Sequence, residues 1–164
     1  MAMKAQAAME YLMTYGWAIL IVIIVAAALY ALGVFNPSTW TGDRATGFTN
    51  IGAPASGAWK VSANTPGNFQ VNLRNNLPSR INITSATSVT IESTTCDGLE
   101  VGGVGLLSAE TTVGIGNTFN ITANCTGLTA GSAYTASVKV VYDNLDTGID
   151  AFTDSGTLTG TVGS

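Results

Sequence analysis

The 164-residue sequence has no histidine, and only 10% of its residues are charged. Without histidine, neither a Ser-His-Asp nor a Cys-His catalytic set can form. The only cysteines, Cys96 and Cys125, make no CxxC pair, which also argues against a zinc site. Gly102 to Gly105 lacks the lysine and flanking helix of a phosphate-binding loop. We therefore expect no metal, no cofactor and no enzymatic activity.

Basic residues are also scarce, because six lysines and arginines stand against ten acids, for a net charge of −4. The chain has no basic patch, so nucleic acid is not an expected partner. A surface hydrolase would need paired carboxylates, and the candidates Glu92, Glu100 and Glu110 form no local constellation. A last acidic group surrounds Gly148, but its spacing does not match a calcium-binding EF-hand loop. We expect a solvated turn between strands there, with these acids: Asp143, Asp146, Asp150 and Asp154.

No charged residue occurs between Glu10 and Asp43, and the stretch from Trp17 to Leu32 is almost wholly apolar. About 20 apolar residues suffice to span a bilayer. A helix that is apolar on every side must be buried in lipid or among other helices. We predict one helix over residues 6–35, ended by Asn36-Pro37 because proline breaks the hydrogen-bond ladder.

This helix has two possible surroundings. It could be a plain single-pass anchor with Lys4 inside the cell and the remaining chain outside. Two details favour a helix that also meets other helices. Glu10 lies at the start of the apolar segment, where a carboxylate needs a partner or water. Ala27 and Ala31 form a small-residue face that permits close helix approach.

The segment Lys4-Ala5-Gln6-Ala7-Ala8-Met9-Glu10-Tyr11 resembles the processing region of archaeal type IV pilins with a class III signal peptide. Gly16-Trp17 and the exit Leu32-Gly33-Val34-Phe35-Asn36-Pro37 are also similar to this family. The resemblance implies that a prepilin peptidase cuts between Ala5 and Gln6, which makes residues 1–5 a leader. It further implies that Glu10 pairs with the freed amine of Gln6 on an adjacent subunit.

The same resemblance implies where the protein acts. The precursor would lie in the cytoplasmic membrane, and the pilus assembly machinery would add it to a filament at the archaeal cell surface. Its partners there would be other copies of itself in a helical polymer, and its role would be adhesion. The alternative from the residues alone is a monomeric, membrane-anchored surface binding protein.

Beyond a connector at 36–45, residues 46–164 show short stretches in which apolar and polar residues alternate. Examples are Phe69-Val71-Leu73, Ile81-Ile83 and Phe119-Ile121, with turn-forming clusters between the stretches. This pattern is typical of an antiparallel sandwich. We therefore predict an α+β protein, with a long N-terminal hydrophobic α-helix followed by an antiparallel immunoglobulin-like β-sandwich.

The outside location predicted for the sandwich favours two covalent modifications. An even cysteine count in an oxidising compartment favours a disulfide between Cys96 and Cys125. Three Asn-x-Thr sequons provide glycosylation candidates at Asn82, Asn120 and Asn124. Asn82 and Asn120 alternate with strand isoleucines and are expected to face outward, whereas Asn124 adjoins Cys125.

Overall fold

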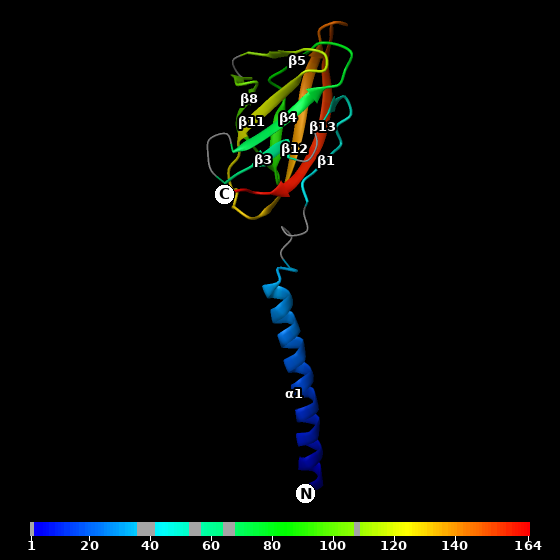
Figure 1. Ribbon diagram of the computed structural model, residues 1–164, viewed down its shortest axis with the longest axis vertical. Coiled ribbons are helices and arrows are strands. Elements are labelled where there is room, and N and C mark those ends of the chain that lie inside the picture. Colours follow the sequence, from blue (N-terminus) through cyan, green and yellow to red (C-terminus); the bar gives the residue numbers. More distant parts are fainter. Residues whose placement is uncertain (1, 36–41, 53–56, 64–67, 107–108) are drawn as a thin grey trace. The chain divides into compact units, whose positions relative to one another are not determined.

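The computed structural model describes residues 2–35, 42–52, 57–63, 68–106 and 109–164, and it divides the chain into two compact units, Met1–Thr39 and Trp40–Ser164. The first unit holds the helix α1 (Ala2–Ala31), and the second holds two packed antiparallel sheets (Figure 1). The predicted helix followed by an antiparallel sandwich is confirmed. Within the expected connector, residues 36–41 lie outside the described residues, and Arg44 and Ala45 already belong to the first strand.

Helix α1 ends at Ala31, four residues before the predicted end. The cause is Gly33, which adopts a left-handed conformation with φ of 70°. The Gly33 amide donates to the Tyr30 carbonyl, and the Val34 amide donates to the Leu29 carbonyl. These two bonds form a Schellman cap, which satisfies carbonyls that the helix end would leave without partners. Glycine is favoured at this position because it lacks the Cβ that makes left-handed backbone costly.

The first sheet is built around a long hairpin of β12 (Ala133–Asn144) and β13 (Ile149–Thr161). Strand β1 (Arg44–Thr46) pairs with β13, whereas β5 (Ile81–Ile83) and β6 (Ser88–Ile91) pair with different parts of β12. The sheet is completed by β10 (Thr111–Val113) beside β5 and β7 (Thr94–Thr95) beside β6.

The second sheet has β4 (Phe69–Asn75) and β11 (Thr118–Asn124) at its centre. Strands β2 (Ile51–Gly52) and β3 (Trp59–Val61) pair with β4, while β8 (Asp97–Val101) pairs with β11 and with β9 (Val104–Gly105). Alternate residues of both sheets point into a shared core, as the sequence periodicity predicts. Its largest fully buried side chains include Tyr142, Phe69, Ile51, Leu73, Ile81 and Ile121.

One acidic residue contradicts the expected solvated turn. Asp154 is only 5% exposed and lies within β13. Its carboxylate accepts hydrogen bonds from the backbone amides of Thr49, Asn50 and Ile51, at 3.1, 2.6 and 2.7 Å. A buried carboxylate is tolerated when several N–H donors satisfy it. Asp154 thereby fastens the segment that passes from β1 in one sheet to β2 in the other.

Candidate functional site

The most unusual surface among the described residues is that of α1. A stretch of 23 residues, Met9–Ala31, is long and apolar enough to cross a membrane, and none of its hydrophobic window is buried within the chain. Nearly all of its large apolar side chains are exposed, from 48% for Leu20 to 78% for Tyr30. At 1.5 Å per residue the stretch measures about 35 Å. That length matches a hydrocarbon core of about 30 Å.

The predicted assembly residues all lie on α1. The helical backbone is continuous through Ala5 and Gln6, whose side chains lie outside the described ones. Glu10 lies at the N-terminal end of the apolar stretch, and its carbonyl accepts a hydrogen bond from the Thr14 hydroxyl at 3.0 Å. Ala27 and Ala31 are one turn apart and both exposed. The helix thus presents a carboxylate near one end of the span and a small-residue face near the other.

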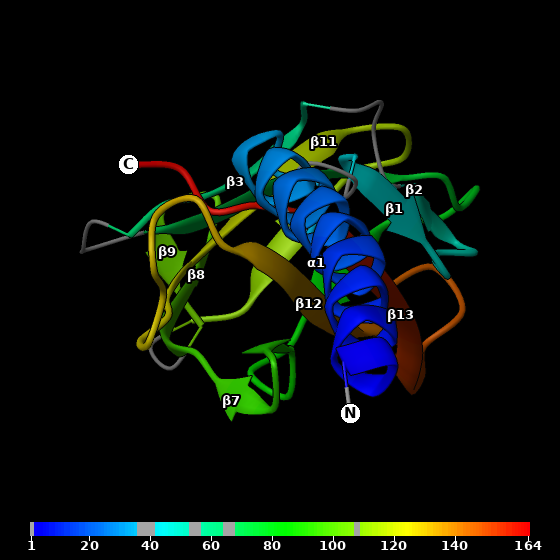
Figure 2. The ribbon, with the colours of Figure 1, turned by 90° about the horizontal axis from the view of Figure 1, so that it is seen from below.

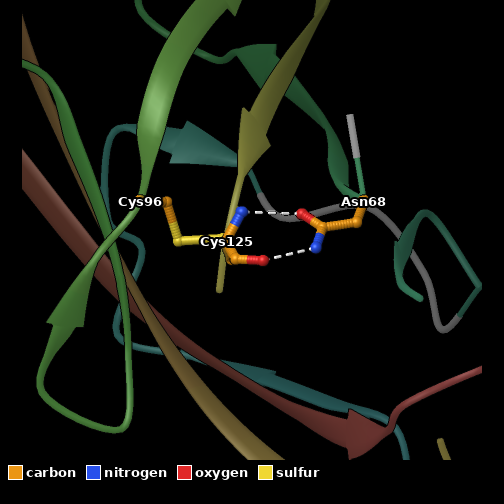
Figure 3. Close-up of a disulfide and its surroundings, with 3 residues drawn as sticks. All are labelled: Asn68, Cys96 and Cys125. Atoms are coloured by element: carbon orange, nitrogen blue, oxygen red, sulfur yellow. Dashed lines mark hydrogen bonds between the residues drawn. A yellow bond between two sulfur atoms is a disulfide. The ribbon is translucent and has the colours of Figure 1, made fainter. Parts of the chain in front are cut away.

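The sandwich carries the expected disulfide between Cys96 and Cys125 (Figure 3). Cys96 follows β7 of the first sheet, and Cys125 follows β11 of the second. Asn68, only 1% exposed, donates to the Cys125 carbonyl at 2.5 Å and accepts from the Cys125 amide at 2.7 Å. The sequence carries no signal for Asn68, because a single buried asparagine leaves no pattern. The disulfide and the two hydrogen bonds of Asn68 together fix the end of β11.

The sequon asparagines occupy three different settings. Asn120 is exposed on β11 between the inward-facing Phe119 and Ile121. Asn82 is partly exposed on β5, and its side-chain amide donates to the Glu110 carboxylate. Asn124 is partly exposed at the end of β11. The outward orientation predicted for Asn82 and Asn120 agrees with these positions, whereas their modification stays a prediction.

The other acidic residues around Gly148 make separate contacts. Asp146 forms an ion pair with Arg80 at 2.8 Å. Hydrogen bonds from the backbone and side chain of Arg80 lower the pKa of Asp146. Asp143 accepts a hydrogen bond from the Ala151 amide at 2.7 Å. No group of three histidine, cysteine or acidic residues that could hold a metal occurs in the part of the chain that the structure describes.

The three glutamates considered for a hydrolase come from different parts of the sandwich. Glu92 lies in the turn between β6 and β7, Glu100 on β8, and Glu110 immediately before β10. Elsewhere in the core, burial together with the nearby Asp43 carboxylate raises the pKa of Tyr134 to about 12. Neither a known protein-family model nor any curated protein matches the chain.

Proposed function

We propose that the chain is a structural subunit of an archaeal type IV pilus-like surface filament. Its helix would lie in the cytoplasmic membrane before assembly and pack against the helices of other copies afterwards. The observation that supports this best is the span Met9–Ala31, whose side chains have no cover within the chain. One all-round apolar surface suits both lipid and a bundle of similar helices.

In this proposal the prepilin peptidase removes residues 1–5, and Glu10 then pairs with the new amine of Gln6 on a neighbouring subunit. In a dry core, the loss of one partner of an ion pair costs about 3–5 kcal/mol, because the other charge stays buried without a counter-charge. Such a penalty would favour one axial register of neighbouring helices. The disulfide-bonded sandwich would coat the filament, carry glycans at Asn82, Asn120 or Asn124, and serve adhesion as a binding rather than a catalytic domain.

Electron microscopy of material sheared from the cell surface, combined with peptide identification and N-terminal sequencing, tests this proposal. We expect filaments that contain this chain and a mature N-terminus at Gln6. A chain that is found only as a membrane-bound monomer starting at Met1 or Ala2 would contradict it. That result would favour the alternative, a monomeric surface binding protein held by a single-pass anchor.

A further inference from the structure

A cleft of about 320 Å³ lies between two loops of the sandwich, outside the helix and the disulfide already described. One wall is the β6–β7 hairpin, and the other is the segment between β11 and β12. Figure 2 looks toward this end of the sandwich, where β7 and the yellow segment before β12 are visible. The polar side chains of its lining carry one carboxylate and several hydroxyls: Glu92, Thr94, Thr126, Thr129, Ser132 and Tyr134.

The hairpin wall has an unusual backbone. Ile91 pairs with Thr94, so Glu92 and Ser93 form a two-residue turn, and their φ angles are 46° and 78°. A turn with two positive φ angles strongly prefers Asn-Gly, because other side chains are strained there. Strained backbone is often found at functional sites, where other demands override local preference. Here the strained pair includes Glu92, the one charged residue among the described residues that line the cleft.

Both walls are held firmly. The disulfide joins Cys96, one residue after β7, to Cys125, one residue before Thr126, so it links the two walls covalently (Figure 3). The Glu92 amide donates to the Thr135 carbonyl at 3.2 Å, which ties the turn to β12. The Ser132 carbonyl accepts from the Val162 amide at 2.8 Å, which ties the other wall to the C-terminal segment. A cleft with fixed walls binds a ligand without first having to order itself.

The lining indicates which ligand the cleft would take. A lone exposed carboxylate attracts a cation only weakly, so charge is a poor basis for recognition here. Hydroxyls both donate and accept hydrogen bonds, and Glu92 accepts strongly from hydroxyl groups. Leu128 and Val162 add apolar surface for C–H groups. We propose that this cleft binds a neutral sugar ring, with Glu92 accepting hydrogen bonds from its hydroxyls.

The size of the cleft agrees with this ligand class. Its volume lies at the lower end of the range for small-molecule sites, which suits a single ring better than a long oligosaccharide.

The proposal requires only a folded sandwich with access to solvent. It does not depend on filament assembly, so each of the two proposals can fail without the other.

The test is an amide NMR titration of the full chain in dodecylphosphocholine micelles, a detergent without a sugar headgroup. Glucose, mannose, galactose and N-acetylglucosamine are each added to about 50 mM, because weak sites have millimolar dissociation constants. We expect saturable shifts at Glu92, Ser93 and residues 126–132 with at least one sugar. Methylammonium chloride is the control for simple cation binding. It is expected to leave the chemical shifts of these amides unchanged.

Two variants separate binding from folding. Glu92→Ala is expected to raise the sugar dissociation constant about tenfold or more, whereas the matched Glu100→Ala on β8 leaves it unchanged. The double change Glu92→Asn with Ser93→Gly installs the preferred turn sequence and removes the carboxylate, so it is expected to raise the melting temperature and to weaken sugar binding. The proposal is overturned if no sugar gives saturable shifts, if methylammonium alone gives them, if Glu100→Ala weakens binding equally, or if the Asn-Gly variant binds normally.

Discussion

At the scale of single residues, the buried carboxylate of Asp154 joins β13 to a segment far away in the sequence. Three backbone amides, those of Thr49, Asn50 and Ile51, depend on its carboxylate. Beside it, Phe48 lies over Gly156, where a Cβ would collide with the phenyl ring. The acid and the glycine together hold the segment between β1 and β2 against β13. That segment connects the two sheets at the point where the chain enters the sandwich.

Replacing Asp154 with asparagine is expected to loosen this segment. The amide offers one good acceptor where the carboxylate offers two, and its NH₂ group faces N–H donors. We expect the sandwich to lose about 2 kcal/mol of unfolding free energy. Hydrogen exchange at Thr49, Asn50 and Ile51 should accelerate more than in the core strands. Asp150→Asn, at an exposed position of the same strand, is the control, and equal protection of these three amides in both variants would refute the role of Asp154.

The ion pair of Asp146 with Arg80 predicts a pH dependence. Because the folded pKa of Asp146 lies below its unfolded value of about 3.9, its stabilising effect is complete above that value. The effect is lost as the pH falls through the folded pKa. The stability difference between the wild type and Asp146→Asn is therefore expected to shrink between pH 5 and strongly acidic solution, as measured by urea unfolding at each pH. A difference that stays constant over this range would contradict the prediction.

At the scale of secondary-structure elements, the disulfide joins two positions that are 29 residues apart in sequence. Closing a loop of this length is worth about 3 to 4 kcal/mol in the chain-entropy model. The double variant Cys96→Ser with Cys125→Ser is expected to lose that much unfolding free energy in urea. Dithiothreitol should lower the stability of the wild type similarly and leave the variant unaffected. Equal stability of the wild type with and without reductant would contradict the prediction.

The sequence predicts the elements whose signal is local and regular. An uncharged apolar run suffices to predict α1, and clear alternation predicts β4, β11 and β12. Strand β13 gives a weaker pattern, because the inward positions of its second half are Asp154, Gly156, Leu158 and Gly160. Two of these are glycines, since Phe48 fills the space beside Gly156, and Asp43 and Tyr134 fill the space beside Gly160. Such packing arises from distant segments, so no local pattern reveals it.

The candidate sites also differ in whether a local sequence pattern predicts them. The exposed helix with Glu10, Ala27 and Ala31 follows from the order of residues along one segment. The cleft beside Glu92 does not, because its walls are brought together by strand pairing and the disulfide. The Glu92-Ser93 turn also lacks the Asn-Gly or Asp-Gly signature by which such turns are recognised in a sequence. Its geometry follows from the pairing of Ile91 with Thr94, which joins two strands of the folded sheet.

At the scale of the whole molecule, the chain combines two units with opposite requirements. The sandwich buries its apolar side chains in its own core and is closed by a disulfide. The apolar surface of α1 is not buried within the chain and needs cover from outside it. Lipid alone could supply that cover for an anchor, and a bundle of helices could supply it for a filament. Glu10 distinguishes these two environments, because a carboxylate has different consequences in each.

Changing Glu10 to glutamine is expected to leave membrane insertion intact and to impair filament formation. In lipid, losing a charge at the edge of the span is neutral or favourable. In a filament core, the change would leave the Gln6 ammonium of a neighbouring subunit without its counter-charge, which is costly even if the amine partly deprotonates. The plain anchor and the filament subunit therefore predict opposite outcomes. The measurement is the number of filaments per cell beside the membrane-bound pool of subunit, with N-terminal sequencing to check that the leader is removed. If fully processed Glu10→Gln subunits assemble at the normal level, Glu10 does not set the register of the helices.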